Sequence, residues 1–383
     1  MRKGTNRENL LGVAATVLGL LLAGWMATTH GAEYDPRAIR ITQDPETYAM
    51  GWSHAFTVRD PDTGEWAFLP LMGHNHSPGT NNSVRIFRPL ADKWRYWQRD
   101  LQDQLTKEEW FSDKQTKPPS ASGRNNYIGF YLPWEGEAGQ LWIAAPGGSL
   151  ASNHGVFDLA EKEWTRLVGN GNKKDFAPVR YANDRATKLV SGWNYADAVC
   201  DSRRTLVRYG GKHQGILVLV TPAKDGRGYV AKGFADQPPG QRNQVRNAAI
   251  CVDGKFYLFG GNREWKGKAL SEVWRLDVET REWTRLPSTP HPVPPLAQVT
   301  YDPDIERAVI LFNRGTRIGT YDLSDGEFRD LSGTLDLPAA SNAVGSFVPG
   351  VGHLYRGGEW DDGGWTSSRR IYCVSLAPEQ DCG

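Results

Sequence analysis

A unit of four short apolar stretches is repeated along the chain, and this repeat is the strongest constraint on the fold. The clearest copy is AAICVDGKFYLFGGNREWKGKALSEVWRLDVETREWTRL, residues 248–286. It predicts two strands joined by a tight turn, a polar loop after Gly260-Gly261, and two further strands that end near Trp283. Because a single four-stranded sheet cannot cover both of its faces, the copies must pack against one another.

Other parts of the chain keep the same frame. Strand two ends at a glycine pair or a degenerate version of it at Gly73, Gly147-Gly148, Gly210-Gly211, Asn313-Arg314-Gly315 and Gly357-Gly358. An Asp lies six positions before an aromatic residue in three copies, in Asp158 and Trp164, Asp277 and Trp283, and Asp322 and Phe328. Six copies account for about residues 50–383, with longer connections near 98–124 and 168–192.

The doubled Gly, the apolar-Asp step and the Trp at these spacings resemble a kelch repeat, and the chain is similar to the propellers of the galactose-oxidase-like central domain superfamily. The resemblance implies an all-β, kelch-type β-propeller. Six blades are expected, and a seventh is left open because kelch repeats run at about 50 residues. The last copy has a poor fourth strand, so we expect Ala38–Thr42 to complete it and close the ring.

The recurring aromatic residues belong to the repeat and are interpreted as packing between blades, which keeps them off the list of candidate site residues. They are Trp94, Trp164, Trp283 and Phe328. The 42 Gly, 23 Pro and 15 Trp of the chain fit many turns and large rigid side chains.

Residues 1–32 have the layout of a leader. Arg2, Lys3 and Arg7 precede the uncharged run 10–27, which small residues follow, as in a signal peptide. The run is also about the shortest that could span a bilayer, so an uncleaved amino-terminal membrane anchor is the alternative. In both cases residues 33–383 are predicted to be a single extracytoplasmic domain, periplasmic or secreted.

Charge and cysteine content limit the partners and the compartment. The 45 Lys and Arg nearly balance the 44 Asp and Glu, so no electrostatic attraction to nucleic acid is expected. All four Cys follow the leader, where an oxidising compartment permits disulfides. Cys373 and Cys382 are expected to pair, and Cys200 and Cys251 either pair with each other or stay as buried thiols.

In an up-and-down blade, the loop between strands two and three lies at the same end as the start of strand one. We call this end the loop face. Six His map to it, namely His54, His74, His76, His154, His213 and His291, whereas His353 maps to the opposite end. Candidate ligand-binding aromatic and amide residues on the loop face are Trp52, Asn126, Tyr127, Trp193, Asn194, Asn247, Trp265, Gln298, Asn342, Trp360 and Trp365.

This mixture of indoles and amides suits a sugar, although the loop face could collect polar residues simply because it carries the longer loops. The first hypothesis is therefore an exported propeller that binds a glycan or an envelope protein and requires no cofactor. The alternative is a sugar- or uronate-acting lyase, epimerase or hydrolase, in which His54, His74 or His154 removes a proton and Arg246 stabilises a carboxylate or enolate.

A divalent metal is a further candidate for the loop face. His74 and His76 lie two apart and would point the same way on an extended segment, and His154 or His213 could complete the set of ligands. The sequence lacks the motifs of several other kinds of site, since it has no phosphate-binding loop, no Gly-x-Ser-x-Gly nucleophile elbow and no CxxC pair. It also has no Tyr-His step, which the copper-radical oxidases among kelch-like propellers use.

Overall fold

The chain divides into two units, Met1–Pro36 and Arg37–Gly383, and the described part of the second contains six β-sheets. The computed structural model describes residues 36–45, 54–70, 84–98, 128–144, 154–167, 179–189, 195–210, 215–235, 248–264, 267–312, 317–335, 337, 340–361, 364–366 and 370–383. Among these residues, 3-10 turns are present but no helix has the length and apolar character needed to cross a membrane. The apolar run 10–27 lies outside them.

Each sheet is one blade, and the strand that begins its copy of the repeat, which we call the first strand, is an edge strand. Blade 1 consists of β2 (Ala55–Arg59), β3 (Trp66–Pro70), β4 (Val84–Arg88) and β5 (Lys93–Gln98). Blade 2 consists of β6 (Ile128–Leu132), β7 (Gln140–Ala144), β8 (His154–Asp158) and β9 (Glu163–Leu167). Blade 3 consists of β11 (Tyr195–Cys200), β12 (Thr205–Gly210), β13 (Ile216–Pro222) and β14 (Tyr229–Phe234), with β10 (Val179–Tyr181) parallel to β14.

The second half of the chain repeats this antiparallel order. Blade 4 consists of β15 (Ala249–Val252), β16 (Lys255–Phe259), β17 (Val273–Asp277) and β18 (Trp283–Leu286). Blade 5 consists of β19 (Gln298–Asp302), β20 (Arg307–Leu311), β21 (Ile318–Asp322) and β22 (Phe328–Asp330). Blade 6 consists of β23 (Ala340–Val348), β24 (Gly352–Asp361), β26 (Arg370–Ser375) and β1 (Arg37–Gln43), with β25 (Gly364–Thr366) paired to β24.

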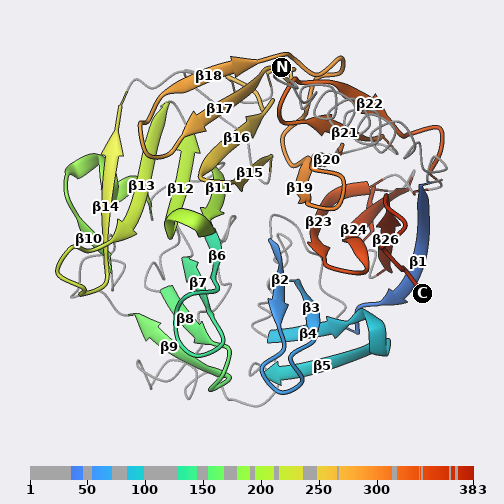
Figure 1. Cartoon of the computed structure of the whole chain (residues 1–383), viewed down its shortest axis with the longest axis horizontal. Coiled ribbons are helices and arrows are strands. Elements are labelled where there is room, and N and C mark those ends of the chain that lie inside the picture. The colour runs from blue at the N-terminus through green and yellow to red at the C-terminus, as the bar shows by residue number, and fades with distance from the viewer. Residues whose placement is uncertain are drawn as a thin grey trace, which may run out of the picture. The chain divides into compact units, whose positions relative to one another are not determined.

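The first strands of the blades lie next to one another. β6 contacts β11, β11 contacts β15, β15 contacts β19, β19 contacts β23, and β23 contacts β2. Between β2 and β6, the rings of Phe56 and Tyr131 lie 6.4 Å apart. The second unit is therefore a six-bladed β-propeller, as the repeat predicts, and not the seven-bladed alternative (Figure 1).

The amino-terminal strand closes the ring. β1 pairs antiparallel with β26, from Arg37 opposite Ser375 to Gln43 opposite Arg370, so that the two ends of the domain share blade 6. The predicted role of Ala38–Thr42 is confirmed. Asp44, directly after β1, is fully buried and pairs with Arg85 of blade 1 and Arg356 of blade 6.

The Asp of the repeat forms the turn between strands three and four. In Asp158, Asp277 and Asp322, Oδ1 accepts hydrogen bonds from the backbone N–H groups two and three positions later. The carbonyl of each Asp accepts a third bond from the residue four positions later, where φ is positive, in Lys162, Arg281 and Gly326. The carboxylate thus satisfies turn amides that no strand partner reaches.

The aromatic residues of the repeat pack within and between blades. The ring of Trp283 lies 5.1 Å from Tyr209 of blade 3 and 6.3 Å from Phe256 of its own blade. Trp94 lies 5.3 Å from Phe87 in a cluster that includes Val348 of blade 6. The side chain of Trp164 lies outside the described residues.

Gly260 illustrates why the glycine pair recurs at the end of strand two. It has a φ of 49°, and a Cβ there would lie 2.3 Å from the carbonyl oxygen of Val293. Leu270 and Val293, in the long connections of blade 4, meet in a short antiparallel bridge beside it. A side chain at this position would therefore separate the polar loop from the sheet edge.

One long connection contains structure that the repeat does not predict. The segment 168–192 carries β10 and a 3-10 turn at Asp184–Leu189, which gives blade 3 a fifth strand. The amide of Asn183 donates to the carbonyl of Gly233, and its Oδ1 accepts from the Gly233 N–H. The other long connection, near 98–124, lies almost wholly outside the described residues.

Both cysteine pairs form disulfides. Cys200–Cys251 joins the end of β11 to β15 in the neighbouring blade, and Cys373–Cys382 closes the carboxyl-terminal loop onto β26. The expected carboxyl-terminal pair is confirmed, and Cys200 and Cys251 adopt the paired alternative. Two disulfides are consistent with an extracellular protein.

Candidate functional site

The six first strands enclose a cavity of about 300 Å³, which we call the axial cavity. Every blade contributes to its wall through residues at 55–57, 129–131, 197–199, 249–251, 298–301 and 345–347. Successive side chains of a strand point to opposite faces of its sheet. Each blade therefore presents backbone atoms as well as side chains to the cavity. The cavity exists only because the ring is closed.

Its wall combines aromatic rings with hydrogen-bonding groups. The aromatic side chains are Phe56, Phe130, Tyr131, Tyr301 and Phe347. Hydroxyl, amide, imidazole and carboxyl groups come from Thr57, Thr300, Ser346, Gln298, His54, Asp197 and Asp201. Small-molecule sites have this composition, with apolar and aromatic surface and a few polar groups that fix orientation.

Two residues predicted from the sequence line the axial cavity. His54 lies directly before β2, and its ring stacks on Phe56 at a centroid distance of 6.2 Å. Gln298 begins β19, is 8% exposed, and donates a hydrogen bond from Nε2 to the carbonyl of Val299 at 3.3 Å. Both therefore lie at the start of a first strand, which is where the sequence placed His54.

Other predicted site residues lie wholly or partly outside the described part of the chain. The wholly excluded ones are Trp52, His74, His76, Asn126, Tyr127, Trp193, Asn194, His213, Arg246, Asn247 and Trp265. Only the backbone is described for His154, Asn342, Trp360 and Trp365. The metal site and the catalytic roles of His54, His74, His154 and Arg246 remain predictions. Within the described residues, no three His, Cys, Asp or Glu side chains group as metal ligands.

The two remaining His lie away from the cavity wall. His291, in the connection between blades 4 and 5, has its ring edge-on to Phe328 and its Nε2 3.5 Å from Asp330. His353 is the second residue of β24, next to the turn from β23, at the end expected for it, and is fully buried. Among the His side chains that are described, only His54 reaches the axial cavity.

Charge on the wall is concentrated in blade 3. Asp197 is on β11, and its Oδ1 lies 3.8 Å from Nε of the buried Arg208. Asp201 follows β11 at the cavity rim, where partial loss of water raises the pKa of its carboxyl. Burial raises the pKa of Tyr131 to about 12, and the negative charge of Asp201 contributes to that rise.

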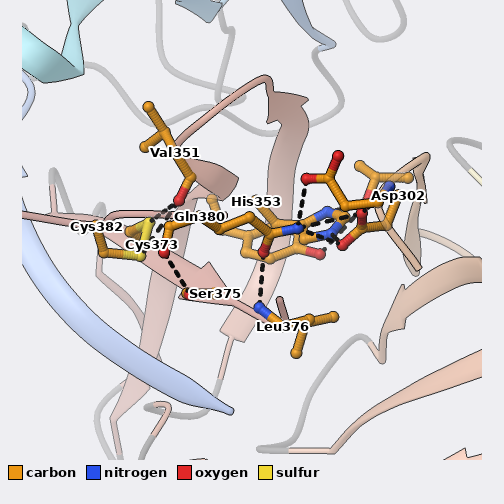
Figure 2. A network of polar contacts seen from close by, with 11 residues as sticks. Asp302, Val351, His353, Cys373, Ser375, Leu376, Gln380 and Cys382 are labelled. Atoms are coloured by element: carbon orange, nitrogen blue, oxygen red, sulfur yellow. Dashed lines mark hydrogen bonds and ion pairs between the residues drawn. A yellow bond between two sulfur atoms is a disulfide. The ribbon is translucent and has the colours of Figure 1, made fainter. Parts of the chain in front are cut away.

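A buried network connects the wall to the carboxyl terminus (Figure 2). His353 Nδ1 lies 2.8 Å from Oγ1 of Thr300, which lines the cavity, and its Nε2 lies 2.9 Å from Oδ2 of Asp302. Gln380 donates from Nε2 to the same oxygen at 2.9 Å. Gln380 belongs to the loop that Cys373–Cys382 closes, so the disulfide holds it against blade 5.

This network keeps Asp302 ionised. Burial by itself would raise the pKa of Asp302, but the hydrogen bond and charge of His353, together with the bond from Gln380, lower it below the usual carboxyl value. The ionised carboxylate consequently stabilises the folded state at pH values above the ordinary carboxyl pKa. Blades 5 and 6 are thereby fixed to each other behind the cavity wall.

Sequence reasoning missed most of the wall. Thr57, Tyr131, Asp197, Tyr301 and Phe347 lie inside first strands and look like ordinary strand residues. A signal was nevertheless present, because three or four successive residues of the first strand in every copy line the cavity. Aligning the six copies on their first strands would have selected these residues.

Comparison with known proteins agrees with the fold. A kelch motif matches residues 245–290, which contain the clearest copy of the repeat. A search of curated proteins gave no match to the chain. The chain is thus a six-bladed β-propeller that carries a kelch motif, and this fold is typical of protein-interaction scaffolds.

Proposed function

We propose that this protein is an exported binding propeller that receives the end of a glycan in its axial cavity. The leader and the two disulfides support export into an oxidising compartment. The axial cavity is near the lower limit of small-molecule sites, so it suits a single small ring better than a folded protein segment. A binding role also agrees with the scaffold function typical of kelch propellers.

The observation that carries this proposal is the mixed wall of the axial cavity. Rings such as Phe56 and Tyr131 offer flat apolar surface to the C–H face of a pyranose. Thr57 and Gln298 offer a hydroxyl and an amide beside them, which can exchange hydrogen bonds with sugar hydroxyls. The side chain of Thr57 already donates to the carbonyl of Phe347, so its oxygen is held in one orientation.

The loop-face residues predicted from the sequence extend this proposal. Trp52, Tyr127, Asn194 and Asn247 lie within three positions before the starts of four first strands, β2, β6, β11 and β15. Under the proposal, they contact the part of the glycan that remains outside the axial cavity. The alternative is an envelope protein bound through the same loops, and the glycan experiment below distinguishes it from a bound glycan.

A cavity-filling substitution tests the proposal. Ala198→Phe adds a ring to a half-buried position on the cavity wall, so we expect binding to immobilised glycans to fall at least about tenfold. The measurement is a glycan array with the purified mature domain, followed by calorimetric titration of the strongest glycan. Ala182→Phe, at an exposed position after β10, is the matched control and should bind as the wild type does.

The outcomes separate the hypotheses. A glycan bound equally well by Ala198→Phe with an unchanged melting curve would exclude the axial cavity as the site. An array without any bound glycan would reject the glycan proposal, and binding to an envelope protein alone would favour the alternative partner.

A further inference from the structure

The wall of the axial cavity has an unbalanced charge. Its described residues include the carboxyl groups of Asp197 and Asp201, and none of them is Lys or Arg. We propose that the axial cavity selects a ligand that carries a protonated primary amine, and specifically a sugar with a free amino group. This inference rests on the proposed glycan function and adds the chemical class of the sugar.

Asp201 is the carboxylate available to such a cation. Asp197 already faces Arg208, whereas the carboxyl group of Asp201 forms no hydrogen bond or ion pair within the described part of the chain, where only its backbone carbonyl accepts a bond, from Arg204. Partial loss of water opposes ionisation of Asp201 and raises its pKa, and an ammonium group placed beside it would reverse that effect. A cationic ligand therefore supplies the counter-charge that the described wall lacks.

Gln298 gives a second and independent indication. Its side chain is 8% exposed and lines the cavity, yet Oε1 accepts no hydrogen bond from the described residues. A buried acceptor without a donor is unfavourable, because the lost water is not replaced. An ammonium group has three N–H donors, so an amine at the start of β19 can serve the Gln298 oxygen, and an amine at the end of β11 can serve the Asp201 carboxylate.

The aromatic surface of the cavity is compatible with the same ligand. Phe56, Tyr131, Tyr301 and Phe347 come from four different blades and line the same space. The face of an aromatic ring carries partial negative charge and attracts ammonium groups within about 6 Å. A wall that combines such rings with an unpaired carboxylate favours a cation over a neutral or anionic sugar.

Calorimetric titration with matched sugars tests this selectivity. At about pH 6 the amine of glucosamine is protonated, and we expect glucosamine and its deacetylated trimer to bind at least about tenfold more tightly than N-acetylglucosamine and its trimer. Added salt should weaken the binding of the amine, because an exposed carboxylate contributes to it. Lysine and Nε-acetyl-lysine form a second pair, which tests the amine without the sugar.

Two variants connect the selectivity to the wall. Asp201→Asn should lower affinity for glucosamine at least about fivefold and leave N-acetylglucosamine binding unchanged. Asp225→Asn is the matched control, since this exposed carboxylate pairs with Arg180 and does not line the cavity. Melting curves of both variants confirm that the fold persists.

The results distinguish this inference from the proposed function. Equal binding of glucosamine, N-acetylglucosamine and glucose would retain the glycan function and overturn the amine selectivity. Binding of lysine, without binding of any sugar, would retain the amine selectivity and overturn the glycan function. If Asp201→Asn binds glucosamine as the wild type does, the assignment to this carboxylate is wrong.

Discussion

Removing residues 33–45 is expected to abolish cooperative folding of the propeller. The deletion takes away β1, which is the outer strand of blade 6, and with it the ladder that joins Arg37 to Ser375 and Gln43 to Arg370. It also removes Asp44 from between two buried arginines. Their combined loss is expected to exceed about 5 kcal/mol, which is comparable to the whole stability of many domains. Thermal unfolding followed by circular dichroism measures the effect.

Deletion of residues 1–32 alone is the control for this experiment. It leaves β1 and Asp44 in place, so we expect its melting temperature to equal that of the protein that retains residues 1–32. If the 33–45 deletion melted cooperatively at the same temperature, the closing role of β1 would be refuted.

The substitution Asp44→Asn is expected to lower the free energy of unfolding by about 3–5 kcal/mol, because it leaves buried guanidinium groups without their carboxylate. Nε of Arg85 lies 2.8 Å from Asp44 Oδ1, and Nε of Arg356 lies 2.6 Å from Oδ2. All three side chains are at most 1% exposed. Urea denaturation measures the difference.

Asp62→Asn provides the comparison for an exposed ion pair. Asp62 contacts Lys162 and Arg95 at the surface, where solvent screens the charges, so the loss of stability should be small. A similar midpoint for Asp44→Asn and Asp62→Asn would show that the Asp44 site does not hold the ring together.

The blade architecture could be predicted because it depends on local chemistry that repeats. Asp277 and Asp322 mark the same turn in successive blades, and Gly260 marks the end of strand two. The last copy has no good fourth strand after the strand that contains Cys373, so a strand from elsewhere in the chain has to complete the blade. Ala38–Thr42 was the apolar strand that belonged to no copy, and it pairs with β26. The sequence therefore predicted both six blades and their closure.

Contacts between blades could not be predicted in the same way. Asp44 and Arg85 are 41 positions apart, and nothing near either residue indicates the other. The segment Asp184–Leu189 lacks an apolar alternation, so its packing on blade 3 was missed. The axial cavity is likewise a product of the closed ring, and Tyr131 or Asp201 gains a role only when all six first strands are placed together.

Hydrogen–deuterium exchange with and without the deacetylated glucosamine trimer tests most directly whether the axial cavity is the binding site. The account predicts slower exchange in first strands of several blades, within 55–57, 197–201, 298–301 and 345–347, and unchanged exchange in the outer strands β5, β9 and β18. Protection confined to the outer strands, or no protection at a saturating concentration of the trimer, would contradict it.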